Sequence, residues 1–193
     1  MNIGTYSYEE YVHLVKSFHG SLAPGLVIGG FMVDLALKHL PEGEFFDAIC
    51  ETPVCLPDAV QLLTPCTIGN GWLNVLDFGR FAVTLYDKAG GQGIRVYLDM
   101  EKLEAWPEVK SWYMKLKTKR EQDFDLLMSQ IKEAGHGLFS MQTVHVEPKK
   151  LQRPKLGPVA VCPACGEAYP VRDGGRCRAC AGESPFLSLA DRK

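Results

Sequence analysis

Four cysteines near the C-terminus form the clearest chemical motif of the 193-residue sequence. Cys162 and Cys165 make one Cys-x-x-Cys pair, Cys177 and Cys180 make a second, and eleven residues separate the two pairs. Each pair can present two sulfurs about 3.5 to 4 Å apart, and two pairs complete the tetrahedron that Zn²⁺ prefers with thiolates at about 2.3 Å. The spacing predicts a structural zinc site, with redox-active or iron-binding thiols as the alternatives.

The segment around these cysteines is too small and too poor in apolar residues to fold without help, so zinc would supply most of its folding energy. A short helix after the second pair would make it a treble-clef or ribbon-like finger. Arg172, Arg176 and Arg178 give it a basic character. Because no aromatic platform or recognition helix accompanies them, we expect a solubilising or subunit-docking surface and no nucleic-acid partner.

A second pair of cysteines, Cys55 and Cys66, brackets a short helix in the stretch 51–71. Pro57 suits the first turn of a helix and Pro65 disfavours its continuation, so the helix should be about two turns long. Cys55 lies at its N-terminal entrance, where unpaired N–H groups and the helix dipole favour a thiolate and should lower the thiol pKa.

His19 lies in a glycine-flanked turn and is the best partner for Cys55 in a metal or nucleophile site. The alternative is a purely structural role for both residues, as a buried cysteine and a histidine with its hydrogen bonds satisfied. Cys66 is the third candidate, as a cofactor ligand. Eleven residues of continuous helix would hold Cys66 about 16 Å from Cys55. The two could share a metal only if the chain folds back or a second protomer supplies one of them.

Helices and strands alternate around these residues in a way that predicts an α+β fold, with an antiparallel sheet packed against helices. Amphipathic spacing and a capping box predict a helix over 8–18, and an almost wholly apolar segment predicts a buried helix over 26–39. Gly29 and Gly30 inside the latter should mark close packing against another backbone, with a partner protomer as one candidate. Strands are expected at 45–50, 73–78, 80–87, 94–98 and 138–146, and helices from Pro107 and over 121–134.

Composition predicts one core domain with a small appendage. The formal net charge is −2, but residues 147–193 carry nine Lys and Arg against five Asp and Glu, which is +4 and leaves −6 for the rest. The basic, proline-rich segment 148–159 should be a linker between a core domain at 1–147 and a finger at 160–193. Without a signal-peptide pattern or an uninterrupted apolar run, we expect a cytoplasmic protein with no membrane contact.

Several peptides resemble the FmdE family, which takes its name from one component of formylmethanofuran dehydrogenase. They are F-H-G-S-L-A-P-G-L at 18–26, E-T-P-V-C-L-P-D-A-V-Q at 51–61, P-C-T-I-G-N-G at 65–71 and D-F-G-R at 77–80. The segments C-P-A-C-G-E and C-R-A-C-A-G-E-S resemble the zinc-finger extension of many members. The resemblance implies an α+β domain with a treble-clef zinc finger, in a homodimer. It also implies a function beside a molybdenum or tungsten complex whose pterin and iron–sulfur chemistry resides in other subunits.

The resemblance points to His19, Cys55 and Cys66 as a metal or active site in the core domain. Members commonly carry F-H-G-H, whereas Ser21 stands at the second histidine position here, and Ala23 stands where cysteine is often found. A hydroxyl is a poor ligand for borderline cations, so these departures weaken the expected second metal site.

The residues and the resemblance support three hypotheses about function. The first is an accessory protein of molybdenum- or tungsten-dependent one-carbon redox metabolism, a component or relative of the complex rather than an autonomous catalyst. The second is an interaction or regulatory protein that senses a small ligand or metal and binds nucleic acid or protein through its basic finger. The third is a small metal-dependent enzyme that uses the thiolate of Cys55, with His19 as a ligand or proton carrier.

Overall fold

The computed structural model describes residues 1–40, 45–147, 151 and 157–186, and it divides the chain into two compact units, 1–151 and 152–193. Most of the predicted linker, 148–159, lies outside the described residues.

The first unit is built on a five-stranded mixed sheet with the strand order β4-β3-β5-β6-β7. Its strands are β3 (Phe46–Cys50), β4 (Leu73–Val75), β5 (Ala82–Asp87), β6 (Gln92–Leu98) and β7 (Phe139–His145). All neighbours are antiparallel except β3 and β4, which run parallel. The predicted α+β fold with an antiparallel sheet packed against helices is confirmed, and the one parallel pair, β3 and β4, lies at the edge of the sheet. Parallel neighbours need a crossover connection, and the helix between β3 and β4 supplies it.

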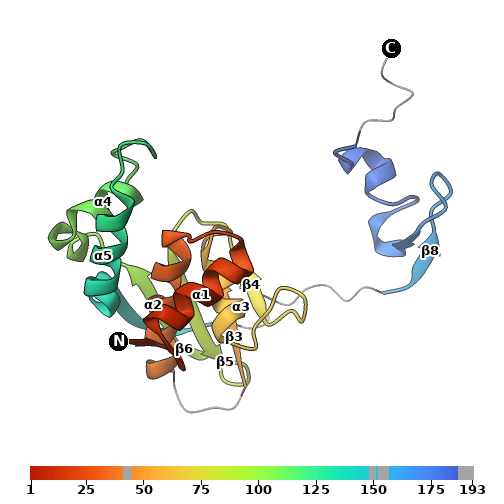
Figure 1. Cartoon of the computed structure of the whole chain (residues 1–193). Helices are drawn as coiled ribbons and strands as arrows, with labels where there is room; N and C mark the ends of the chain where they lie inside the picture. The colour runs from red at the N-terminus through yellow and green to blue at the C-terminus, as the bar shows by residue number, and fades with distance from the viewer. Residues whose placement is uncertain (41–44, 148–150, 152–156, 187–193) are drawn as a thin grey trace. The chain divides into compact units, whose positions relative to one another are not determined.

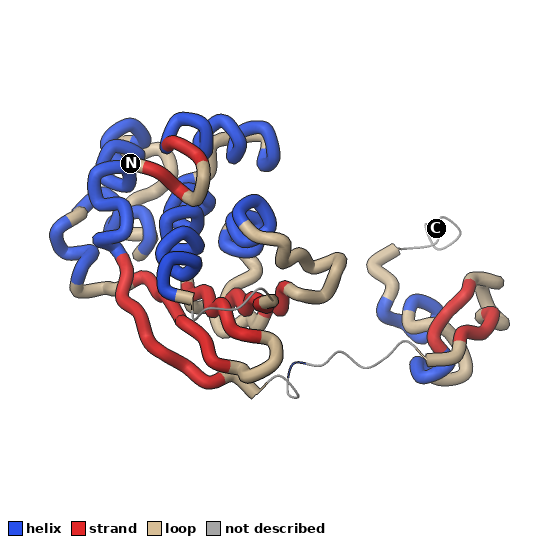
Figure 2. The backbone as a smooth tube through the Cα atoms, turned by 90° about the horizontal axis from the view of Figure 1, so that it is seen from below, coloured by secondary structure: helices blue, strands red, loops and turns tan. Residues whose placement is uncertain are grey.

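The larger helices gather on one side of the sheet (Figures 1 and 2). They are α1 (Tyr8–His19), α2 (Pro24–His39), α3 (Leu56–Leu63), α4 (Pro107–Tyr113) and α5 (Phe124–Ala134). Two short strands, β1 (Asn2–Ile3) and β2 (Tyr6–Ser7), precede them, and the 3₁₀ turns η1 (Lys102–Ala105) and η2 (Gly135–Leu138) flank α4 and α5. None of the helices in the described ranges combines the length and apolar character needed to span a bilayer.

Helix α1 begins at the predicted capping box. The Ser7 side chain accepts a hydrogen bond from the Glu10 backbone N–H at 3.2 Å, and the Glu10 carboxylate accepts one from the Ser7 N–H at 2.7 Å. This reciprocal pair satisfies two of the unpaired N–H groups at the helix start. Helix α1 ends at Gly20, whose φ of 79° is left-handed. The glycine therefore ends the helix directly after His19, which is its last residue.

Helix α2 is buried from Gly25 to Ala36 and forms the centre of the core. A Cβ atom added to Gly30 would overlap the Tyr11 ring, and one added to Gly29 would lie 2.9 Å from the Ala59 side chain. The close packing predicted from these glycines therefore occurs, but the nearest atoms belong to side chains of α1 and α3 of the same chain rather than to a backbone. Tyr11 donates a hydrogen bond to the Leu26 carbonyl at 3.2 Å, which holds its ring against the helix.

The second unit contains the antiparallel pair β8 (Val159–Val161) and β9 (Ala168–Pro170), a 3₁₀ turn η4 (Val171–Asp173) and a short helical segment η5 (Ala179–Glu183). Tyr169 in β9 is buried, and its hydroxyl donates a hydrogen bond to the Gly174 carbonyl at 3.0 Å. Apart from this ring the described part of the unit has little apolar core, so the cysteines that join its two halves must hold it together.

Candidate functional sites

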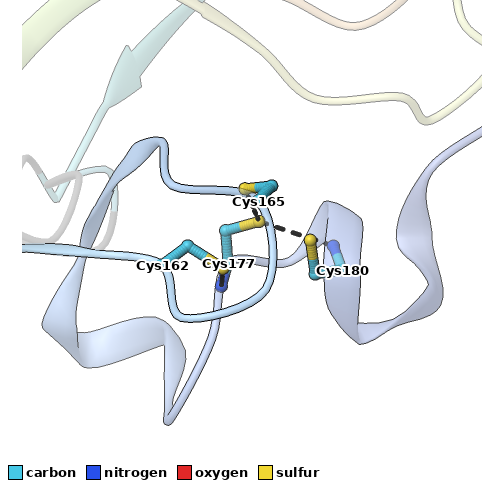
Figure 3. Close-up of side chains that lie close together, drawn as sticks. All are labelled: Cys162, Cys165, Cys177 and Cys180. Atoms are coloured by element: carbon cyan, nitrogen blue, oxygen red, sulfur yellow. Dashed lines mark hydrogen bonds between the residues drawn. The ribbon is translucent and has the colours of Figure 1, made fainter.

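The four cysteines of the second unit converge on one point (Figure 3). Their sulfur atoms all lie within 4.8 Å of one another, and the Cys165 and Cys177 sulfurs are 3.8 Å apart. That separation matches the edge of a tetrathiolate tetrahedron with Zn–S bonds of about 2.3 Å. Cys162 and Cys165 follow β8, Cys177 lies two residues before η5, and Cys180 lies within it. The fold thus brings together two pairs that eleven residues separate in the sequence.

Backbone N–H groups point to two of these sulfurs. The Cys177 N–H points to the Cys162 sulfur at 3.5 Å, and the Cys180 N–H points to the Cys177 sulfur at 3.4 Å. Backbone donors, that of Cys177 first, lower the pKa of Cys162 to about 6, whereas the neighbouring thiols, that of Cys177 first, raise the pKa of Cys180 to about 12. A thiolate is the form that binds metal, so the donor set and its environment fit the structural zinc predicted from the sequence.

Carboxylates of the finger partly neutralise its basic surface. The Arg178 guanidinium pairs with Glu183, and the Arg172 Nε lies 3.8 Å from an Asp173 carboxylate oxygen. Both acids lie within five residues of their arginines in the sequence. These local pairs reduce the positive charge that the finger offers to a nucleic acid.

In the first unit, Cys55 is the N-cap residue of α3 with an unusual backbone conformation. Its φ is +60°, and a Cβ added to Gly25 of α2 would lie only 3.0 Å from its sulfur. Burial raises the pKa of the Cys55 thiol, the Asp58 carboxylate raises it further, and the Lys115 ammonium opposes both. The prediction of a lowered pKa at this helix entrance is therefore wrong, because desolvation and Asp58 outweigh the favourable interactions.

Two neighbouring cavities open beside α4. The smaller, of about 180 Å³, is lined by Cys55, Gly25, Phe81 and Tyr113 among others. The larger, of about 530 Å³, is lined by His19, Ser21 and the residues that follow them into α2. Trp112 and Lys115 line both. Cys55 and His19 thus lie in adjacent cavities with a shared wall, rather than in one.

His19 and Asp58 are 3.5 Å apart, measured from the imidazole Nδ1 to a carboxylate oxygen. Asp58 belongs to the first turn of α3 and is also one of the groups that raise the pKa of Cys55. It therefore links the two sequence-predicted residues electrostatically. Nothing in the sequence places Asp58 next to His19, because the two are thirty-nine residues apart.

Cys66 lies beyond the other end of α3, away from this pair. It is buried, its thiol donates to the Phe46 carbonyl at 3.4 Å, and burial raises its pKa to about 11. Buried Cys50 is its thiol neighbour, with a pKa raised to about 12 by desolvation. Within the described chain, the finger cysteines are the one group of three or more His, Cys, Asp or Glu side chains placed to hold a metal ion.

Asn70 closes the glycine-flanked turn after Cys66. Its side-chain oxygen accepts from the Thr67 and Trp72 N–H groups at 3.0 Å, and its amide donates to the Pro65 carbonyl at 2.7 Å. The Asn70 side chain thus satisfies the backbone of this turn from within.

Trp112 belongs to the apolar stripe of α4, and the structure shows it partly buried as a wall of both cavities. Lys115, Lys117 and Lys119 also line the larger cavity. The sequence signal for them is the basic run K-L-K-T-K-R at 115–120, whose position beside the His19 turn only the fold reveals.

Comparison with known proteins places these features in a family. The model "FmdE, Molybdenum formylmethanofuran dehydrogenase operon" matches residues 18–146, and the model "FmdE treble clef zinc finger" matches residues 153–187. The crystal structure of a tungsten formylmethanofuran dehydrogenase FmdE-like protein from Syntrophus aciditrophicus is 54% identical in sequence, with a TM-score of 0.86. The similarity covers 96% of this chain and 98% of that one.

A more distant relative is a probable S-adenosyl-L-methionine-binding protein of Archaeoglobus fulgidus. It is 32% identical over 190 residues, which cover 86% of this chain and 51% of the relative. The chain therefore spans about half the length of this relative.

Proposed function

Since the chain belongs to the FmdE family and carries its treble-clef zinc finger, we propose that it is an accessory protein of molybdenum- or tungsten-dependent one-carbon redox metabolism. The finger holds a structural zinc through Cys162, Cys165, Cys177 and Cys180. The core unit contributes the site at Cys55 and His19. The protein acts as a homodimer beside the redox subunits.

One observation carries the proposal: the similarity to the FmdE-like protein of Syntrophus aciditrophicus extends over nearly the full length of both chains. Similarity over both units argues that they serve one function. The four finger sulfurs are all committed to the metal, so the finger has no open coordination position for catalysis. Any chemistry of the accessory role therefore takes place in the core unit.

Cys55 and His19 have the properties of a site that binds or positions a ligand. Both are partly accessible, and each lines a cavity that shares Trp112 and Lys115 with the other. The raised pKa of Cys55 keeps it a neutral thiol at neutral pH, which does not suit an unassisted nucleophile. A metal bound here would need ligands beyond these two side chains.

The accessory role is tested by purifying the affinity-tagged chain from its native cells and measuring molybdenum and tungsten by mass spectrometry. The proposal expects one of these metals to co-elute with the wild type, at more than the level in an untagged control. A purified dimer with zinc alone, obtained under conditions where the tungsten or molybdenum enzyme is expressed, would refute association with such a complex.

The second metal is tested on the same preparations. Wild type and a Cys55→Ser, His19→Ala double variant are compared for total metal per chain. A metal equivalent beyond the finger zinc that is lost only in the double variant supports a metal at Cys55 and His19. Equal metal content in the two proteins removes that part of the proposal and leaves the finger zinc untouched.

The second candidate is a ligand-binding protein that acts through its core unit. Its support is the larger cavity, whose volume of about 530 Å³ falls in the range of small-molecule sites, together with the name of the Archaeoglobus relative. Titration calorimetry of the intact protein with S-adenosylmethionine is the direct test. Saturable heat that disappears when a residue lining the cavity is substituted supports this candidate. The absence of saturable heat with every compound titrated removes it.

A further inference from the structure

The larger cavity has an apolar side and a cationic side. Leu22, Ala23, Pro24, Phe124 and Leu127 contribute apolar surface, with Trp112 between them and the smaller cavity. Lys115, Lys117 and Lys119 contribute ammonium groups, and none of the described residues lining the cavity is an aspartate or a glutamate. A cavity lined by one sign of charge concentrates ions of the opposite sign.

One of the three ammonium groups is compensated and two are not. Lys117 pairs with buried Glu108 at 2.7 Å, so its charge is already balanced. Among the residues that the structure describes, neither Lys115 nor Lys119 forms an ion pair with a carboxylate. The Lys115 ammonium instead lies 5.5 Å from the centroid of the Trp112 ring. The cavity therefore keeps an uncompensated positive charge near its aromatic wall.

A buried hydrogen-bond donor belongs to the same cavity. The Gln122 side chain lines it, and its Nε2 atom is buried without a hydrogen-bond partner in the described structure. An unpaired buried amide costs about 1–3 kcal/mol, so such atoms call for an acceptor. Gln122 lies three residues from Lys119, and an oxygen of a bound acid could satisfy both.

The backbone at Lys115 is consistent with a binding role. Its φ of +57° is a conformation that glycine adopts more cheaply, in the position just after α4 where helices commonly end on glycine. The chain has a lysine there instead. In this strained conformation the lysine lines both cavities.

From these observations we infer that the larger cavity binds a small organic anion, whose carboxylate or phosphate lies against Lys115, Lys119 and Gln122 and whose planar or apolar body packs on Trp112. The inference rests on the second candidate function, because it names the chemical class of the ligand of the core unit. It is independent of any association with a tungsten or molybdenum complex.

The charge of the cavity distinguishes this class from S-adenosylmethionine. That molecule carries a sulfonium, an ammonium and a carboxylate, so its net charge at neutral pH is +1. Lysine ammonium groups repel the first two and attract only the third. Adenosine monophosphate has the same adenosine body with a negative charge, and adenosine has it with none. The three compounds therefore separate the effect of charge from that of shape.

The test is titration calorimetry of the intact, zinc-loaded protein with these three compounds and with inorganic phosphate, at low ionic strength and again at about 0.15 M salt, where charge interactions are screened over about 8 Å. We expect adenosine monophosphate to bind at least about tenfold more tightly than adenosine or S-adenosylmethionine, and its affinity to fall with salt. Phosphate should bind more weakly, because it lacks a body to pack on Trp112.

Variants then locate the binding. Lys119→Met and Gln122→Leu should each weaken binding of adenosine monophosphate several-fold, to roughly a fifth to a tenth of the wild-type affinity. Lys16→Met is the matched control: it removes one exposed positive charge from α1 outside both cavities, and binding should be unchanged. Tryptophan fluorescence of each variant confirms that the core unit is folded.

Three results would overturn the inference. One is equal or tighter binding of adenosine or S-adenosylmethionine; tight S-adenosylmethionine binding would leave the second candidate standing while removing the anionic class. Another is equal loss of affinity in Lys16→Met and Lys119→Met, which would indicate an effect of net charge alone. Absence of saturable binding by every compound would remove the inference and the second candidate together.

Discussion

Cys55 and Lys115 are the two non-glycine residues of the described chain with positive φ, 60° and 57°, and both line the same cavity. They are sixty residues apart in the sequence and belong to different elements: one caps the start of α3, the other follows α4. Strained backbone is retained where the surrounding structure requires it, which is common at functional sites. Their coincidence at one cavity supports placing the site of the core unit here.

Replacing Lys115 with glycine should stabilise the core while impairing the site. Glycine adopts φ near +57° without the steric cost of a Cβ atom, so we expect the free energy of unfolding to rise by up to about 1 kcal/mol. Urea unfolding followed by tryptophan fluorescence measures this, because all three tryptophans lie in the first unit. Lys119→Gly is the control, since φ at Lys119 is not positive and the substitution should be neutral or destabilising.

The Cys55 thiol should react slowly at neutral pH. Burial and Asp58 raise its pKa above the ordinary value of a cysteine, so the thiolate fraction, and with it the rate of alkylation by iodoacetamide, should rise at a higher pH than for an ordinary cysteine. Peptide mapping by mass spectrometry isolates this residue from the other six cysteines.

Two substitutions should move that profile in opposite directions. Asp58→Asn removes a charge that raises the pKa and should shift the profile to lower pH, whereas Lys115→Met removes one that lowers it and should shift it to higher pH. Identical profiles in wild type and both variants would contradict the electrostatic account of Cys55.

Loss of one finger cysteine should unfold the second unit and leave the first unit folded. Cys177→Ser leaves three sulfurs for a metal that needs four ligands, so we expect zinc to be released and the second unit to unfold. A colorimetric zinc assay measures the first effect. The tryptophan-detected stability of the core should stay within about 0.5 kcal/mol of wild type. Cys55→Ser should retain its finger zinc, and undiminished zinc in Cys177→Ser would disprove the tetrathiolate site.

Glu51 anchors the end of β3 through a buried ion pair. Its carboxylate is bound at both oxygens by Arg95, at 2.6 and 2.9 Å, and by Arg80 at 2.7 Å. Burial raises its pKa, but the two guanidinium groups outweigh burial and hold the pKa of Glu51 below its usual value. Arg95→Met should therefore cost about 3 kcal/mol at pH 7, because it leaves a buried carboxylate with one exposed partner.

The pH dependence follows from the lowered pKa. The pair stabilises the fold above the unfolded-state pKa of about 4.3, and this contribution is lost as the pH falls toward the lower folded-state value. The difference between wild type and Arg95→Met should thus shrink below about pH 4. Arg80 is 61% exposed, so Arg80→Met should cost less than about 1 kcal/mol. An equal loss of unfolding free energy in the two arginine variants would contradict the larger contribution assigned to Arg95.

Local patterns in the sequence predicted most of the elements. The capping box at Ser7 and Glu10 predicted the start of α1, and Pro57 and Pro65 predicted about two turns for α3, which has eight residues. The spacing of the four finger cysteines predicted a zinc site, because a Cys-x-x-Cys turn fixes the distance between its sulfurs locally. The cap, the helix length and the geometry of each single Cys-x-x-Cys pair depend on residues within one or two turns of each other, where the covalent chain itself determines the geometry.

What the sequence by itself determined was therefore the family, through peptides along the chain that resemble it, and the cysteine pairs and the apolar core, through the spacing of their residues. Only the tertiary structure decided that Cys66 packs against Phe46 instead of joining Cys55, and that burial raises the pKa of Cys55. It also decided that the K-L-K-T-K-R run lies beside the His19 turn, about a hundred residues earlier. Burial and long-range proximity depend on how distant elements pack, and no local spacing contains that information.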